Sequence, residues 1–327
     1  MSILKGFYTQ ETQLLEYTGL TDLLLGNFRT NNFGPFTNLS KKNFDLIPVS
    51  ASSIKYTVTE DIDFTRFHVL THLSLYITNK VNIKFPPNIT NLLLRYKCTN
   101  IIVPLELPDK INKIVFEFDS VLETKSLSMI KVCGNKWPPN LENLSIQFSL
   151  SIDVVDTEFP DSIKYLSLDK CYLVLNAFPS NLEFLRMNNC NISNSKWLQL
   201  LPPTLRFLEL QSCCWNPRME LDIFPYGLEF LYIESTFKQS IYNLPPKLKY
   251  LGCNIINFPW HDFIPETLRI IDFRRSFEQI FDRHQYLISI PQVKYIICRA
   301  YEKHPKFKIP VKYDSYYYNN DWHKYLM

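Results

Sequence analysis

The side chains best suited to catalysis or metal binding are few in this sequence, and their spacing suits neither role. His261 and Asp262 are neighbours in the segment WHDF, but adjacent residues rarely form a working acid–base pair. His68 and His72 lie four residues apart in FHVLTHLSL. That segment reads as a strand, on which the two imidazoles would share a face only loosely. The sequence has no glycine-rich phosphate loop, no G-x-S-x-G and no H-E-x-x-H motif. We therefore predict no catalytic residues, no metal ion and no cofactor.

Three of the eight cysteines recur at one position of a repeated pattern. Cys171, Cys190 and Cys213 each come three places after a run of alternating apolar residues. A thiol at that point can bond to backbone groups freed where a strand ends. A zinc site would need closely paired ligands such as C-x₂-C, and the sequence contains no such pair. We interpret the three cysteines as structural.

Composition and charge argue against several classes of partner. The 327 residues include 35 basic and 32 acidic side chains, so the formal charge of +3 is close to balance. A nucleic-acid-binding protein of this size normally shows a stronger basic bias. No stretch approaches the roughly 18 consecutive apolar residues of a membrane-spanning helix, and the first residues do not read as a signal peptide. We predict a cytoplasmic protein with reduced cysteines that binds no nucleic acid, membrane or small-molecule substrate.

An internal repeat organises the chain. Its template is an apolar residue, a proline, two variable residues and then L-x-x-L-x-L, and successive prolines lie 22, 30, 22, 19, 23, 23, 20 and 20 residues apart. The nine copies are FPPNITNLLL at 85, LPDKINKIVF at 107, WPPNLENLSI at 137, FPDSIKYLSL at 159, FPSNLEFLRM at 178, LPPTLRFLEL at 201, FPYGLEFLYI at 224, LPPKLKYLGC at 244 and IPETLRIIDF at 264.

The repeat predicts a leucine-rich-repeat solenoid of the α/β class. The segment x-L-x-L-x has the period of two that marks a strand with one buried face. A unit of about 22 residues is too short to fold alone, so each must bury its leucines against its neighbours. Parallel strands then form a sheet on the concave side, with mostly extended or 3₁₀ segments and a few short helices on the convex side. We expect each proline at the first position of a strand, where no ladder N–H is needed.

The expected organisation is a solenoid over residues 46–300 between two caps. Residues 1–45 are predicted to cover the first sheet edge, and residues 301–327, rich in lysine and aromatic residues, to form a C-terminal cap or tail. Capping-box signals predict convex helices after Ser120 and Ser276. Segment 193–203 has room for one or two helical turns.

The variable positions of x-L-x-L-x should face the concave side and form columns. One column contains aromatic residues in five successive repeats, which we call the aromatic lane: Tyr165, Phe184, Phe207, Phe230 and Tyr250. A second column includes Arg186, Glu209 and Tyr232. Aromatic side chains on consecutive strands can stack and stiffen a sheet. The same strip beside charged residues resembles a partner-binding surface, so we predict these eight residues as the partner-binding site while stacking stays open.

The stretch FKQSIYNLPPKLKYLG, residues 237–252, resembles the FNIP repeats abundant in social amoebae and giant viruses. The resemblance implies a repeat protein, and some proteins of that family recruit ubiquitin ligases through an F-box. The favoured hypothesis is a non-enzymatic module that binds a protein partner through its concave face. The alternative is a structural subunit of a larger assembly such as a virus particle, which would use its flanks and termini.

Overall fold

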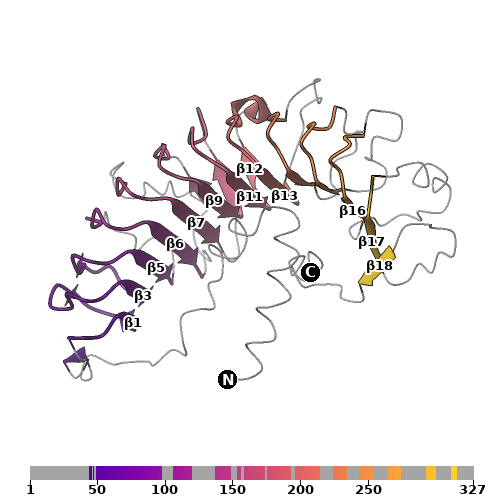
Figure 1. The fold of residues 1–327 in the computed structure, drawn as a ribbon. Helices are drawn as coiled ribbons and strands as arrows, with labels where there is room; N and C mark the ends of the chain where they lie inside the picture. The colour runs from indigo at the N-terminus through magenta and orange to yellow at the C-terminus, as the bar shows by residue number, and fades with distance from the viewer. Residues whose placement is uncertain are drawn as a thin grey trace.

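In the computed structural model, the chain is a curved solenoid whose concave side is a parallel β-sheet (Figure 1). The structure describes residues 44–45, 47, 49–97, 106–119, 137–148, 153–155, 158–173, 175–192, 196–213, 224–233, 243–253, 264–273, 292–299 and 311–314. Within these ranges, the main sheet has thirteen strands. They are β1 (Ser53–Val58), β3 (His72–Ile77), β5 (Asn91–Tyr96), β6 (Lys113–Phe118), β7 (Asn143–Phe148), β9 (Tyr165–Asp169), β11 (Phe184–Asn188), β13 (Phe207–Gln211), β14 (Phe230–Ile233), β15 (Tyr250–Gly252), β16 (Ile270–Asp272), β17 (Tyr295–Arg299) and β18 (Val311–Asp314).

The strands follow one another in chain order, and each is parallel to the next. The register aligns the same repeat position on every strand, so that Tyr165, Phe184 and Phe207 are direct neighbours. The structure also contains two smaller parallel sheets. They pair β2 (Ile62–Asp63) with β4 (Ile83–Lys84), and β8 (Asp153–Val155) with β10 (Cys171–Leu173) and β12 (Asn191–Ile192). The predicted solenoid with a concave parallel sheet is therefore confirmed.

The prolines begin a tight turn rather than a strand, so the predicted position of the prolines was wrong. In eight repeats the proline carbonyl accepts a hydrogen bond from the N–H three residues later, at 3.0–3.3 Å. For example, the Leu182 N–H donates to the Pro179 carbonyl at 3.1 Å, and β11 starts two residues after Leu182. Proline suits this place because its fixed φ favours the turn and its carbonyl is the group the turn uses.

In six repeats, the second "variable" residue after the proline links one turn of the solenoid to the preceding one by a side-chain hydrogen bond. Asn140 and Asn181 donate their Nδ2 to the carbonyls of Asp109 and Asp161 at 3.1 and 2.9 Å. The Thr204 hydroxyl lies 2.8 Å from the Leu182 carbonyl. Equivalent bonds to the preceding repeat are made by Asn88, Ser162 and Thr267. We call this row the turn ladder; it satisfies carbonyls that the turn would otherwise leave without a partner.

The core is a column of inward-facing apolar residues between the strands and the rest of each turn. Leu166, Leu168, Leu185 and Met187 are fully buried. Burial of each such side chain stabilises the fold by about 1.5–3 kcal/mol. A parallel stack therefore depends on every unit covering the leucines of its neighbour, as the repeat length predicted.

On the convex side, one helical segment expected from the sequence lies within the described residues. Segment 193–203 contains one short 3₁₀ helix, η4 (Trp197–Leu200), as expected. The predicted helices after Ser120 and Ser276 lie outside the described residues. Near the first strand, the Phe44 ring packs edge-on against Tyr56 and Phe64, both at 5.4 Å between ring centroids. The predicted caps over residues 1–45 and 301–327 stay predictions.

Candidate functional site

The aromatic lane is a continuous stack over four strands. The rings of Phe184 and Phe207 lie 3.9 Å apart, and the Phe207–Phe230 and Phe230–Tyr250 pairs lie 4.0 and 4.2 Å apart. Interplanar angles of 9–11° make these parallel stacks. The four rings are at most 2% exposed. Tyr165 is half-buried and tilted by 39° to Phe184 at 6.2 Å. The predicted stacking is confirmed, and the binding role of the lane stays a prediction.

Two of the predicted site residues, Arg186 and Glu209, form a largely buried ion pair beside the lane. Glu209 is fully buried on β13, and its carboxylate lies 3.5 Å from Nε of Arg186 on β11. Gln211 donates its Nε2 to the same carboxylate. A buried carboxylate is stable only with such partners. In this part of the sheet, the polar groups therefore hold one another in place.

Tyr232 occupies a space that only glycine leaves open. Its ring lies over Gly252 on the next strand, and a Cβ at Gly252 would come within 2.2 Å of Tyr232 Cδ2. One strand further along, the Tyr250 hydroxyl donates to the buried carboxylate of Asp272 at 2.5 Å. All eight predicted site residues thus lie on one face of the main sheet between β9 and β15. Six of them are buried, and Tyr165 and Arg186 are half-buried.

The remaining concave face, formed by β1 to β9, has a different surface. We call the outward side chains of these strands the polar half. They are every second residue of each strand, starting at its first residue: Ser53, His72, Asn91, Lys113, Asn143 or Tyr165. Apart from Ser74, Leu93 and Val115, these side chains are half-buried or exposed. His72 and Gln147 are exposed. Of this surface, only Tyr165 was predicted as a site residue, because the prediction followed the aromatic column.

A cluster of charged residues lies on β5 and β6 and just beyond them. Nε of Arg95 is 2.7 Å from the Asp119 carboxylate and 3.9 Å from that of Glu117. The hydrogen bond that Arg95 donates to Asp119 raises the pKa of Arg95, while burial raises the pKa of Glu117. Burial and the nearby Arg95 charge lower the pKa of Lys55. The cluster forms a charged rim beside the apolar pair Leu93 and Val115.

A second row of charges precedes the strands by one residue. Glu142, Lys164, Glu183, Arg206, Glu229 and Lys249 alternate in sign over six successive repeats. The ion pairs Glu142–Lys164, Arg206–Glu229 and Glu229–Lys249 measure 2.9, 2.7 and 2.7 Å. Because like charges on neighbouring strands repel, the alternation favours the observed register.

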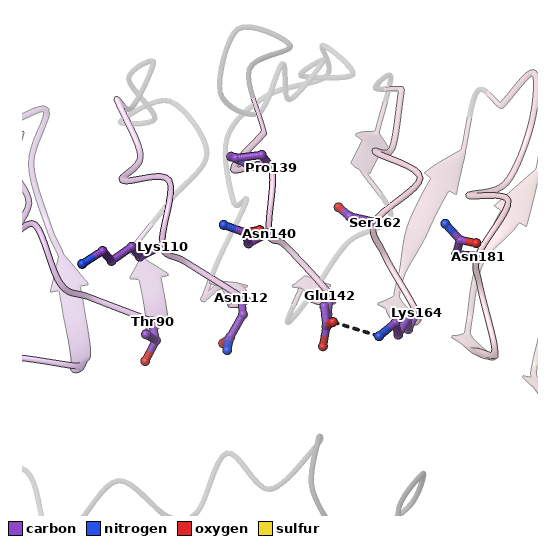
Figure 2. Close-up of a pocket in the computed structure, with 9 residues that line it drawn as sticks. All are labelled: Thr90, Lys110, Asn112, Pro139, Asn140, Glu142, Ser162, Lys164 and Asn181. Atoms are coloured by element: carbon purple, nitrogen blue, oxygen red, sulfur yellow. Dashed lines mark hydrogen bonds and ion pairs between the residues drawn. The ribbon is translucent and has the colours of Figure 1, made fainter.

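A groove of about 590 Å³ runs along this row in the first half of the solenoid, and Figure 2 shows the side chains that line it. Polar side chains from five successive turns line it: Thr90, Lys110, Asn112, Asn140, Glu142, Ser162, Lys164 and Asn181, together with Pro139. The Lys164 ammonium points at the Glu142 carboxylate across the groove floor. The groove lies beside the polar half, since Asn112 and Glu142 directly precede β6 and β7.

The three cysteines are structural, as predicted. Cys171, Cys190 and Cys213 are buried, and each thiol lies 3.3–3.5 Å from the carbonyl two residues before it. The residue just before each cysteine has a positive φ of 49–56°, which turns the chain out of the strand. Burial raises the pKa of Cys171 well above its usual range, so it is a poor nucleophile. Within the described ranges, no group of three or more metal-ligating side chains could hold an ion.

No protein-family model and no curated protein matches this chain. Among solved structures, it is similar to CroV588 of a giant virus, described as a novel circular leucine-rich-repeat protein. The identity is 16%, the match covers 81% of this chain and 44% of that chain, and the TM-score is 0.46. This chain thus spans less than half the length of that protein. In the part of the chain described, no helix is long and apolar enough to cross a membrane. By its own strand order and register, the protein is a leucine-rich-repeat solenoid.

Proposed function

We propose that the protein is a non-enzymatic interaction module that binds a protein partner through the concave face of its solenoid. The observation that supports this proposal best is the polar half. Its side chains stay partly open to solvent on a rigid sheet, whereas the same positions in β11–β16 bind one another. Rigid surfaces lose little entropy on binding, which favours recognition. The cytoplasmic location is part of the same hypothesis.

The polar half has a small apolar centre surrounded by charged and polar side chains, as protein interfaces do. Leu93 and Val115 provide a small apolar centre, 6% and 5% exposed. Around them lie the Arg95–Glu117–Asp119 charges and the exposed amide of Gln147. Protein interfaces commonly combine an apolar centre with a polar rim of this kind.

The test is a capture of partners from cells with a paired set of variants. His72→Glu/Gln147→Arg changes two exposed positions of the polar half, and His68→Glu/Gln199→Arg makes the same changes at exposed positions outside it. Both variants should show the circular dichroism spectrum of the wild type. We expect the first to lose a specific partner and the second to keep it.

Two results would argue against the proposal. If both variants keep every partner, the concave face is not the binding surface. If the wild type copurifies only with itself or with one component in fixed stoichiometry, the alternative of a structural subunit in a larger assembly is favoured, and the flanks should be examined instead.

A further inference from the structure

Lys113 differs from three other half-buried cations on or beside the concave sheet, Arg95, Arg186 and Arg206. It lies on β6 in register between Asn91 and Asn143, so both of its neighbours in the column are uncharged. Among the described residues its ammonium has no hydrogen bond and no ion pair with a carboxylate. Burial lowers the pKa of Lys113 below its usual range. A partly desolvated charge without a partner is costly for the free protein.

The comparison with nearby cations makes the contrast clear. Arg95, Lys164 and Arg206 lie 2.7–2.9 Å from a carboxylate, and Arg186 lies 3.5 Å from one. Glu142, which directly precedes the neighbouring strand β7, pairs with Lys164. Nearby cations therefore do pair with carboxylates, and among the residues that the structure describes Lys113 does not.

Asn143 adds a second unsatisfied group at the same place. Its side-chain Oδ1 is buried and has no hydrogen-bond partner in the described part of the protein. A carboxamide can present either its oxygen or its NH₂ group by turning over. The Asn143 NH₂ group and the Lys113 ammonium can therefore both donate hydrogen bonds to one ligand that has two acceptor atoms. Leu93 and Val115 lie next to the pair and would exclude water from it.

We propose that Lys113 and Asn143 receive a carboxylate of the protein partner, from an aspartate or glutamate side chain. One carboxylate oxygen would accept from the Lys113 ammonium and the other from the Asn143 NH₂ group. Hydrogen bonds between charged groups are shorter and about twice as strong as neutral ones. The proposal rests on the function proposed above and adds the chemistry of its central contact.

A small-molecule titration tests this contact without any knowledge of the partner. The probe is N-acetyl-L-glutamate amidated at its α-carboxyl group, and its side-chain amide analogue is the neutral control. The Cε–Hε resonances of lysine-labelled protein report on each ammonium. We expect a saturable shift and a raised pKa for Lys113 with the carboxylate probe, and neither for the exposed Lys80. No saturable shift at Lys113, or an equal shift with the neutral analogue, would overturn the proposal.

The captured partner supplies the second test. Lys113→Gln should weaken its binding by about 30-fold or more, the usual effect of removing one member of a desolvated charge pair. Lys113→Arg should retain most of the affinity, and Lys80→Gln should retain all of it. Full binding by Lys113→Gln would refute the carboxylate contact while leaving the proposed function intact. Capture of no partner by the wild type would refute the proposed function, and the titration alone would then decide on the contact.

Discussion

The polar half on β1–β9 and the concave face of β11–β16 share one backbone plan but differ in what their outward side chains contact. Both have core leucines at the same positions and the same parallel register. In β11–β16 the outward side chains stack or pair with one another, and all but Arg186 and Asn188 are buried. In the polar half most stay partly exposed. The variable positions of one solenoid can thus stabilise the sheet in one region and remain available for binding in another.

The largest effect should come from breaking the aromatic stack in its middle. Phe207→Ala removes a fully buried ring with neighbours on both sides, so we expect a loss of about 3–5 kcal/mol in the free energy of unfolding. The matched control is Tyr165→Ala, in the same column but half-buried, which should lose less than half as much. Urea denaturation measures both. Equal losses would show that the two regions do not differ as described.

A smaller loss is expected from filling the space under Tyr232. Gly252→Ala places a methyl group against the Tyr232 ring, and overpacking of this kind costs about 1–3 kcal/mol. The double variant Tyr232→Ser/Gly252→Ala should be no less stable than Tyr232→Ser alone, because the clash is then absent. A double-mutant cycle with no coupling between the two positions would contradict this geometry.

The turn ladder should contribute about equally in both regions. Thr204→Val keeps the shape but removes the hydroxyl that bonds to the Leu182 carbonyl, which should cost about 0.5–1.5 kcal/mol. Thr59→Val at an exposed position is the control and should change stability very little. Thermal denaturation measures the melting temperatures of the two variants. An unchanged melting temperature for Thr204→Val would show that the turn ladder does not stabilise the fold.

A further prediction is a dependence of the stability on pH at the boundary between the two regions. Burial raises the pKa of Asp169 from 3.8 to about 6. The folded protein therefore holds a proton that the unfolded chain has already lost, and the contribution of Asp169 to stability falls as pH rises from 3.8 through about 6. Asp169→Asn should abolish this part of the pH profile. A wild-type profile that matches the variant across that window would contradict the raised pKa.

Much of the fold could be predicted because the signal is repeated. The period, the strand positions, the buried leucines and the structural cysteines all follow from a template that recurs nine times. The proline was assigned to the wrong place because the template shows only how far the proline lies from the leucines. It does not show that the proline carbonyl accepts the hydrogen bond of a turn. The turn ladder was missed although its signal was visible: Asn, Ser or Thr occupies that "variable" position in six of the nine copies.

The candidate site was harder to predict for a physical reason. Aromatic residues such as Phe184 and Phe230 attract notice in a sequence, but whether they bind a partner or each other depends on ring geometry and burial. Lys113 carries no such signal, because a lysine in the sequence does not reveal whether a carboxylate of a neighbouring repeat pairs with it, as Glu142 does with Lys164. Contacts between repeats, not residue types, decide which side chains stay available.

The most direct test of the account is hydroxyl-radical footprinting of the free protein and of its complex with the captured partner. His72, Tyr76 and Tyr165 lie in the polar half, while Tyr226 is 70% exposed on a turn outside it. The account predicts that partner binding protects the first three side chains and leaves Tyr226 as reactive as in the free protein. Protection of Tyr226 with unchanged reactivity at His72, Tyr76 and Tyr165 would contradict it.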